Sequence, residues 1–166
     1  MTTKPTRNVR LDPMTADEYP AWEAKMVTGY AAAQVGEGHW APETAERQAL
    51  NVTRGLLPAG VDSHANHLWI ARDAQTGREI GALWIALRTA VDEGPATEAF
   101  IYDIHVSPDV QGEGYGRAVM QAAAAAARAL GAQTVALNVH GANDRAYRLY
   151  KSLGYAVTNR HMRLGL

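Results

Sequence analysis

Apolar residues recur along the chain with two different spacings, and together they predict a mixed α/β domain. Short, almost continuous apolar runs such as 80–87 are typical of strands covered on both faces. Longer segments with apolar residues every three or four positions, such as 114–130, predict helices that pack one face on a core. In chain order the predicted strands are residues 9–11, 67–72, 79–88, 99–106, 134–139 and 155–164. The predicted helices are residues 20–35, 42–57, 114–130 and 143–153.

Helix boundaries are marked by residue types with known roles at helix ends. Thr15 and Glu18 have the spacing of a capping box, while Pro20 suits the first position of a helix, so we expect a separate turn before the first helix. Gly131 is well placed to end the third helix. No Ser/Gly-rich linker divides the sequence. We therefore expect a flexible tail at 1–8 and a single domain over 9–166, with helices on the faces of the sheet.

The composition narrows the classes of partner. The chain has 166 residues, with 16 Lys and Arg against 17 Asp and Glu, and a net charge of −1. Nucleic acids and anionic membranes recruit clustered basic charge, so we expect neither as a partner. No apolar run approaches the ~20 residues of a membrane span, and the first residues lack the apolar core of a secretory signal. We therefore expect a cytoplasmic protein.

The chain contains no cysteine. Disulfides, cysteine-ligated zinc and cysteine nucleophiles are excluded by this absence. His64 and His67 have no acidic partner at a suitable spacing, so we predict no metal site. With three serines and no Gly-x-Ser-x-Gly motif, the sequence gives little support to a serine hydrolase.

A glycine-rich loop follows the predicted strand 99–106 and precedes the helix 114–130. Glycines at 112, 114 and 116 allow a tight turn that points several backbone N–H groups at one anion, and the helix dipole adds partial positive charge there. Arg117 stands where a dinucleotide-binding loop would have its third glycine, and no Gly-Lys-Ser/Thr follows as in a P-loop. The loop therefore predicts a phosphate or pyrophosphate site of another kind.

A second motif, one strand later, makes the chain resemble the GNAT superfamily of N-acetyltransferases. The loop matches that family's Gln/Arg-x-x-Gly-x-Gly/Ala pattern through Gln111, Gly114 and Gly116. The second motif has the family pattern Asn-x-x-Ala-x-x-Leu-Tyr-x-x-x-Gly-Phe/Tyr. Its matching residues are Asn143, Ala146, Leu149, Tyr150, Leu153, Gly154 and Tyr155. The resemblance covers about residues 9–164 and implies a mixed sheet of six to seven strands flanked by about four helices.

The resemblance implies that acetyl-CoA is the co-substrate. In the family, pantetheine binds the end of the third long strand like an extra strand, and the pyrophosphate binds the amides of the glycine loop. The implied coenzyme A-binding residues are Ile104, His105, Val106, Gln111, Gly112, Glu113, Gly114, Tyr115, Gly116, Arg117, Asn138, Asn143, Ala146 and Tyr150. Because a carboxylate repels a pyrophosphate, we expect Glu113 to contribute its amide and to turn its side chain to solvent.

Two proton-transfer roles follow from the resemblance. Tyr150 is implied as the general acid, because a phenol with a pKa near ~10 keeps its proton at neutral pH and can pass it to a departing thiolate. The general base has no obvious inherited position, since many family members have Glu or His where this chain has Asn138. Asp103, His105, His140 and an ordered water are the candidates, and we favour Asp103. Strand alternation places Asp103 and His105 opposite Tyr102 and Ile104, unless a bulge shifts the phase.

The acceptor pocket is implied to lie against the first two helices and their junction. The expected acceptor-binding residues are Tyr30, Glu37, His39, Trp40 and Tyr102. Acidic and aromatic groups suit a cationic amine, through Coulomb attraction and cation–π contact. We therefore expect direct acetyl transfer to a primary amine of a small molecule or peptide. The alternative is a non-catalytic domain that binds or senses acyl-CoA, and a homodimer is possible on family precedent.

Overall fold

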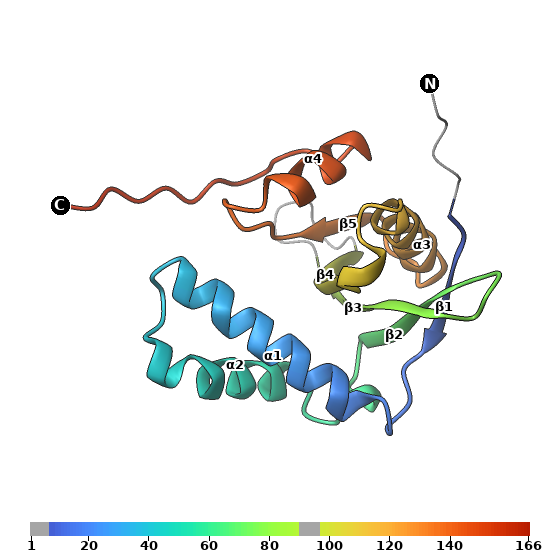
Figure 1. The fold of residues 1–166 in the computed structure, drawn as a ribbon, viewed down its shortest axis with the longest axis horizontal. Coiled ribbons are helices and arrows are strands. Elements are labelled where there is room, and N and C mark those ends of the chain that lie inside the picture. Colours follow the sequence, from blue (N-terminus) through green and yellow to red (C-terminus); the bar gives the residue numbers. More distant parts are fainter. Residues whose placement is uncertain (1–6, 90–96) are drawn as a thin grey trace.

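The computed structural model describes residues 7–89 and 97–166, whose chain folds into one sheet with helices on both faces (Figure 1). Within these residues, the strands are β1 (Val9–Pro13), β2 (Asn66–Asp73), β3 (Glu79–Thr89), β4 (Thr97–Val106) and β5 (Thr134–Leu137). The α-helices are α1 (Tyr19–Gly36), α2 (Pro42–Leu56), α3 (Tyr115–Ala129) and α4 (Asp144–Ser152). Short 3-10 turns lie at Gly60–Asp62 and Pro108–Val110.

The sheet is mixed, with strand order β1-β2-β3-β4-β5. Neighbours from β1 to β4 are antiparallel, and β5 is parallel to β4. The described residues thus form five strands, so the expectation of six to seven was wrong. The difference is at residues 155–164, which are extended but pair with no strand of the described chain. An extended segment becomes a strand only where another strand's edge is available to it, and this segment leaves α4 without reaching one.

Two apolar layers hold the helices to opposite faces of the sheet (Figure 1). Trp22 of α1 packs with Ile70 and Trp84 of the sheet on one face. On the other face, Met120 of α3 packs with Leu83 and other apolar strand residues. Helix α2 packs along α1, where Ala31, Ala45 and Ala49 are buried together. The small side chains allow these two helices to approach closely, so α1 and α2 form a pair beneath the sheet.

The predicted helix boundaries are confirmed at α1 and α3. The backbone N–H of Thr15 donates to Glu18 Oε2 over 2.9 Å, and the Glu18 N–H donates to Thr15 Oγ1 over 3.3 Å, which completes the capping box. Helix α1 then starts at Tyr19 with Pro20 in its first turn. Gly131 has a φ of 86°, a left-handed value that glycine adopts without strain, directly after α3.

The predicted tail at 1–8 falls largely outside the described residues. Of its last two residues, Arg7 forms an ion pair with Glu113, and the Asn8 carbonyl accepts a hydrogen bond from the Ala74 N–H. In the described part of the chain, no helix has both the length and the apolar character that a membrane crossing requires.

Candidate active site

The glycine loop lies between the end of β4 and the start of α3. Gly112 and Gly114 have φ values of 86° and 101°, and Gly114 is the residue that caps α3. Such positive φ angles strain residues with a Cβ, so the loop's path requires glycine. The first bond of α3 is donated by the Ala118 N–H to the Gly114 carbonyl. The preceding amides of the first turn have no acceptor within the helix, and they form a candidate anion site of the kind found at helix N-termini.

Side chains around the loop are held away from these amides. Glu113 Oε2 accepts a hydrogen bond from Arg7 Nη2 over 2.6 Å, and its side chain remains 44% exposed. The Tyr115 hydroxyl donates to Asp73 Oδ2 over 2.7 Å in a buried contact. That bond is the main cause that lowers the pKa of Asp73 to about 2 and raises the pKa of Tyr115. The side chain of Tyr115 therefore anchors the start of α3, which leaves only its backbone N–H for the candidate anion site.

Two arginines lie beside the loop. Arg117 Nη2 donates to Ser152 Oγ over 2.7 Å, which joins α3 to α4. Arg145 Nη1 donates to Gln111 Oε1 over 3.3 Å, and a Cβ at Gly112 would lie 3.9 Å from Arg145 Nη2. The Arg145 guanidinium thus lies directly against the loop. The sequence did not lead us to assign Arg145 to the site. Its position just after Asn143 was the signal that would have included it.

Strands β4 and β5 separate next to the loop. Their pairing ends at Ile101 and Leu137, whereas β4 continues to Val106. On its other side, β4 remains paired with β3 up to Val106, opposite Gly81. The edge of β4 from residue 102 to 106 therefore has no strand beside it on the β5 side, within the described chain. An extended amide-containing chain such as pantetheine fits an edge of this kind, because it supplies donors and acceptors at strand spacing.

Helix α4 lies across this opening. Asn143 caps the helix by accepting a hydrogen bond from the Ala146 N–H over 3.1 Å. A Cβ at Gly116 would lie 3.3 Å from Leu149 Cδ2, so α3 and α4 approach closely at the loop. Tyr150 is half-buried, and its ring centroid lies 5.8 Å from that of Tyr155. The glycine loop, the open edge of β4 and α4 together form one continuous candidate site for coenzyme A.

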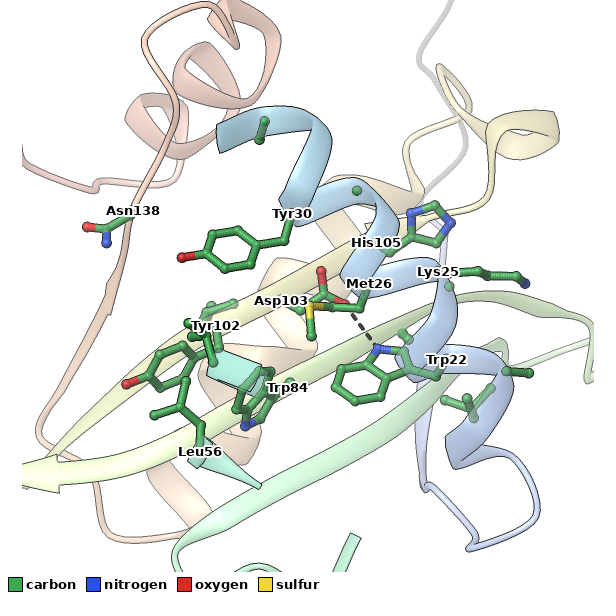
Figure 2. A pocket seen from close by; sticks show the side chains of 18 of the residues that line it. Trp22, Lys25, Met26, Tyr30, Leu56, Trp84, Tyr102, Asp103, His105 and Asn138 are labelled. Carbon is green, nitrogen blue, oxygen red and sulfur yellow. Dashed lines mark hydrogen bonds between the residues drawn. The ribbon is translucent and has the colours of Figure 1, made fainter. Parts of the chain in front are cut away.

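A cavity of about 680 Å³ opens between α1 and the sheet, next to the end of β4 (Figure 2). Aromatic and apolar side chains from α1, β3 and β4 form most of its wall, and Asn138 and His140 line it from the segment after β5. Figure 2 shows Tyr30 extending from α1 toward the side where Asn138 lies. The described residues contain no group of three His, Asp or Glu that would hold a metal ion.

A bulge in β4 sets which side chains reach the cavity. Asp103 pairs with Trp84 and Ile101 pairs with Ile85, so Tyr102 has no opposite residue on β3. After this bulge, Asp103 and His105 line the cavity together with Tyr102, whereas Ile104 packs into the core beneath α3. The sequence predicted Tyr102 and Asp103 on opposite faces of the strand unless a bulge shifted the alternation. The bulge is present, so Tyr102 and Asp103 line the same cavity.

Asp103 is half-buried beside Trp22, which is itself in the core. Trp22 Nε1 donates a hydrogen bond to Asp103 Oδ2 over 3.1 Å (Figure 2). Burial raises the pKa of Asp103, and the Trp22 hydrogen bond and the charge of His105 oppose that rise. Burial also raises the pKa of Tyr150, with a further contribution from the charge of Asp103. The carboxyl group thus lines the cavity, and its charge also raises the pKa of the Tyr150 phenol on α4.

The predicted acceptor residues divide into two groups. Tyr30 and Tyr102 line the cavity. Trp40 lies behind Tyr30 with its ring centroid 5.2 Å away. Glu37 Oε1 lies 2.5 Å from His140 Nδ1, and His39 Nδ1 lies 3.0 Å from Gln34 Oε1. Trp40, Glu37 and His39 therefore contact residues that line the cavity and do not themselves form its wall.

Several lining residues were not assigned to the site from the sequence, among them Trp22, Met26 and Trp84. Trp22 and Trp84 are buried in the core, and both also line the cavity. Met26 lies one turn beyond Trp22 on α1 and completes that wall. The spacing of Trp22, Met26 and Tyr30 at every fourth position of α1 was the signal that would have joined them.

Comparisons with known proteins agree with this geometry. The model of the acetyltransferase (GNAT) family matches residues 32–155. The N-acetyltransferase YycN from Bacillus subtilis is 32% identical over 151 residues, which cover 91% of this chain and 94% of YycN. The crystal structure of YycN superimposes with a TM-score of 0.88 at 31% identity, and covers 96% of this chain and 99% of that one.

More distant proteins share parts of the chain or its fold. A mycothiol acetyltransferase from Propionibacterium freudenreichii is 34% identical over 92 residues, which are 55% of this chain and 28% of that protein. The structure of AAC(6')-Iy, in complex with the bisubstrate analogue CoA-S-monomethyl-acetylneamine, superimposes with a TM-score of 0.60 at 18% identity. It covers 96% of this chain and 98% of that one, and shows the shared fold. From the family match and the likeness to YycN, the chain belongs to the GNAT family of acetyltransferases.

Proposed function

We propose that this protein transfers the acetyl group of acetyl-CoA directly to a primary amine of a small molecule or peptide, with both substrates bound together. The observation that carries the proposal is the position of Asp103, which lines the cavity and whose charge also acts on Tyr150 of α4. The absence of cysteine favours direct transfer, because an acetyl-cysteine intermediate has no residue on which to form.

The donor side is supported by the fit of coenzyme A to the loop and the strand edge. The first-turn amides of α3 would bind the pyrophosphate, with Arg145 and Arg117 as the nearby cations. The edge of β4 from Ile104 to Val106 would hold the pantetheine amides, and Asn143 and Ala146 at the start of α4 would add contacts to the same arm. Acetyl-CoA supplies the activated thioester, and these residues orient it.

On the acceptor side, Asp103 would take the proton that the amine releases as it bonds to the thioester carbon. An ammonium ion has no lone pair, so a base near the cavity is needed to produce the neutral amine. Burial raises the pKa of Asp103 above its usual range, and a carboxylate with raised pKa is a stronger base. The aromatic wall of Trp84 and Tyr102, with ring centroids 4.6 Å apart, suits an amine that arrives as a cation.

Tyr150 would complete the reaction by donating its phenolic proton to the departing sulfur as the C–S bond breaks. Its raised pKa keeps the phenol protonated at neutral pH until a thiolate forms nearby. The proton lost by the amine and the proton given to sulfur are thus handled by two groups on opposite sides of the transferred acetyl group. Both groups return to their starting states through solvent.

The test is a thiol-release assay with acetyl-CoA and a panel of amines, from aromatic monoamines to polyamines, aminoglycosides and peptide N-termini. The proposal expects coenzyme A release that depends on the acceptor, together with acetylated amine detected by mass spectrometry. Acetyl-CoA binding by calorimetry with no acceptor-dependent release across the panel would support the non-catalytic acyl-CoA-binding alternative instead. Absence of acetyl-CoA binding would contradict both.

A further inference from the structure

The cavity beside Asp103 gathers apolar side chains that the fold leaves exposed. Outside the segment after α4, the large apolar side chains exposed in the described chain are Val52, Leu56 and Tyr102, at 41%, 37% and 39%. All three line this cavity. Val52 and Leu56 lie one turn apart on α2, and Tyr102 is the bulged residue of β4. Exposed apolar side chains around one hollow are typical of a ligand site.

A row of aromatic rings runs along the same cavity (Figure 2). Trp22 and Trp84 have ring centroids 5.8 Å apart in an edge-to-face arrangement. Trp84 in turn stacks on Tyr102, with centroids 4.6 Å apart and planes at 22°, and the Phe100 ring lies 4.7 Å from that of Tyr102. Such a row offers ring faces and edges to a flat aromatic body, which gains binding energy beyond that of the area it buries.

Among the described lining residues, one carboxylate has no cationic partner. Glu18 and Glu79 line the cavity, but the Arg72 guanidinium lies 2.9 Å from Glu18 Oε1 and 3.8 Å from Glu79 Oε2. Asp103 forms no ion pair within the described chain, and the hydrogen bond that it accepts there comes from Trp22 Nε1 to Oδ2. The other carboxylate oxygen of Asp103 is therefore open to an ammonium group.

The remaining charge on the wall disfavours an acceptor with several cationic groups. Lys25 of α1 lines the cavity and forms no ion pair within the described chain. A second ammonium group of a polyamine or an aminoglycoside would therefore meet a positive charge and no free carboxylate. The loss of its hydration against aromatic side chains would add a further cost. One cationic group and an uncharged body match this wall.

We propose that the cavity takes an aromatic alkylamine with one positive charge, whose ammonium group meets Asp103 and whose ring packs against Trp84 and Tyr102. The inference rests on the proposed function for the role of this amine as the acetyl acceptor. The nitrogen is bonded to an alkyl carbon, because a nitrogen attached directly to an aromatic ring is uncharged at neutral pH and gains little from a carboxylate. Tyr102 of β4 and Leu56 of α2 are then the residues that select the body of the amine.

The first test measures binding without turnover, by quenching of tryptophan fluorescence and by calorimetry, with and without coenzyme A. The probes are phenethylamine, butylamine, which lacks the ring, phenethyl alcohol, which lacks the charge, and putrescine, which has a second charge in place of the ring. Phenethylamine is expected to bind about tenfold more tightly than each of the others. Equal or tighter binding of putrescine would overturn the proposal whether or not acetyl transfer occurs.

The second test compares kcat/KM for acetyl transfer to phenethylamine, spermidine, kanamycin and a short peptide with a free N-terminus. Phenethylamine is expected to give the highest value, by about tenfold or more. A higher value for the polyamine, the aminoglycoside or the peptide would overturn this inference and leave the proposed function standing. Coenzyme A release with none of the amines would overturn the proposed function, and selective binding of phenethylamine would still support the class of ligand.

A charge added to the wall provides a test by gain of preference. Leu56→Glu places a second carboxylate at an exposed position of the cavity, so kcat/KM for putrescine relative to phenethylamine should rise about tenfold. Val157→Glu is the matched control, because it adds the same charge at an exposed apolar position outside the cavity wall, and it should leave that ratio unchanged.

Removal of a ring provides the complementary test. Tyr102→Leu keeps an apolar side chain but removes the ring that stacks on Trp84, so kcat/KM should fall about tenfold for phenethylamine and much less for butylamine. Substrate ratios that stay at their wild-type values in both Leu56→Glu and Tyr102→Leu would show that the body of the amine lies elsewhere, and would overturn the proposal.

Discussion

At the scale of single residues, Asp103 is a carboxyl group on which burial and hydrogen bonding act in opposite directions. Burial raises its pKa, and the hydrogen bond from Trp22 Nε1 lowers it. Under the proposed function, the balance between these two effects sets the lowest pH at which Asp103 accepts a proton, because a base acts only in its deprotonated form. Trp22 is then a positioning residue for the proposed base as well as a core residue.

Replacement of Trp22 by Phe should move the acid limb of the kcat/KM profile to higher pH. The variant removes the hydrogen bond that favours the charged carboxylate, so the pKa of Asp103 rises further and the active form is lost at a higher pH. The measurement is the pH profile of kcat/KM for the best amine found in the panel.

Trp84→Phe is the matched control for Trp22→Phe, because Trp84 also lines the cavity but donates its Nε1–H to Asn66. Its profile should keep the wild-type acid limb even if its rate falls. Identical acid limbs in Trp22→Phe and wild type would show that Asp103 does not titrate as the base.

Tyr150→Phe should lower kcat by about 10²-fold or more, the usual contribution of a general acid, with little change in acetyl-CoA affinity. The ring remains to pack against the apolar cluster, and only the phenolic proton is lost. Steady-state kinetics and calorimetric titration separate the two effects. Tyr155→Phe, on the neighbouring ring, should leave kcat nearly unchanged, and an unchanged kcat in Tyr150→Phe would remove that residue from the mechanism.

Arg145→Gln should raise the KM for acetyl-CoA roughly tenfold, since a charged hydrogen bond contributes about 1.5–3 kcal/mol. The guanidinium lies against the glycine loop, which is the proposed phosphate site. Acetyl-pantetheine, which lacks the pyrophosphate, should show the same KM with wild type and variant. Arg148→Gln, an exposed position on the same helix, serves as the control; equal losses for both donors would place Arg145 outside the phosphate site.

At the scale of elements, the glycine loop and the start of α3 work as one unit. Gly114 both turns the chain and caps the helix whose first-turn amides face the anion site. Because its φ of 101° is left-handed, a side chain there strains the loop and changes the direction of those amides.

Gly114→Ala should destabilise the protein by about 1–2 kcal/mol and weaken acetyl-CoA binding as well. Gly55→Ala is the opposite case. Its position within α2 has an ordinary helical backbone, and nothing lies within 4 Å of an added Cβ, so that variant should gain about 0.5–1 kcal/mol with unchanged binding. Urea unfolding and calorimetric titration measure the two quantities; a Gly114→Ala protein with wild-type stability would show that the loop tolerates a side chain.

The elements could be predicted wherever the information is local. The capping box at Thr15, the glycine after α3 and the periodicities of α3 and β3 all depend on neighbours in sequence, and the structure has these elements. The segment 155–164 has a strand's pattern but no strand's partner. Pairing depends on which edge a chain can reach, and no residue pattern within the segment contains that information.

The site could be predicted in part for the same reason. The loop and the α4 motif are each a continuous stretch of sequence, so the residues of each could be identified together. The cavity wall joins α1 to β3 and β4, and Trp22 meets Asp103 across 81 positions of chain. A contact of this range is created by the packing of α1 on the sheet, and no pattern local to either residue indicates it.

At the scale of the whole molecule, the contact between Tyr115 and Asp73 ties the glycine loop to the turn between β2 and β3. Asp73 also accepts bonds from the backbone N–H groups of Gln75 and Thr76, so one buried carboxylate holds both the turn and the start of α3. The candidate anion site therefore depends on a charge in the turn of the β2–β3 hairpin.

This contact predicts how stability falls in acid. The pKa of Asp73 is about 2 in the folded protein against an ordinary 3.8, so its contribution is fully present above about pH 4 and is lost as pH falls toward 2. Tyr115→Phe removes the largest cause of that low pKa and should make the melting temperature less dependent on pH in this window. Circular dichroism melts between pH 2 and 5 measure it. Tyr147→Phe should keep the wild-type slope, and an unchanged slope in Tyr115→Phe would contradict the assignment.

The bulge at Tyr102 has a consequence for how such a protein changes over evolutionary time. Removal of this one codon would leave a regular strand in which Asp103 and His105 still face the cavity and Ile104 still faces α3, because the bulged residue takes no part in the alternation. The strand therefore accepts an insertion or a deletion here without exchanging its two faces. Position 102 can therefore gain, lose or change a single aromatic ring in the cavity wall while Asp103 stays in place.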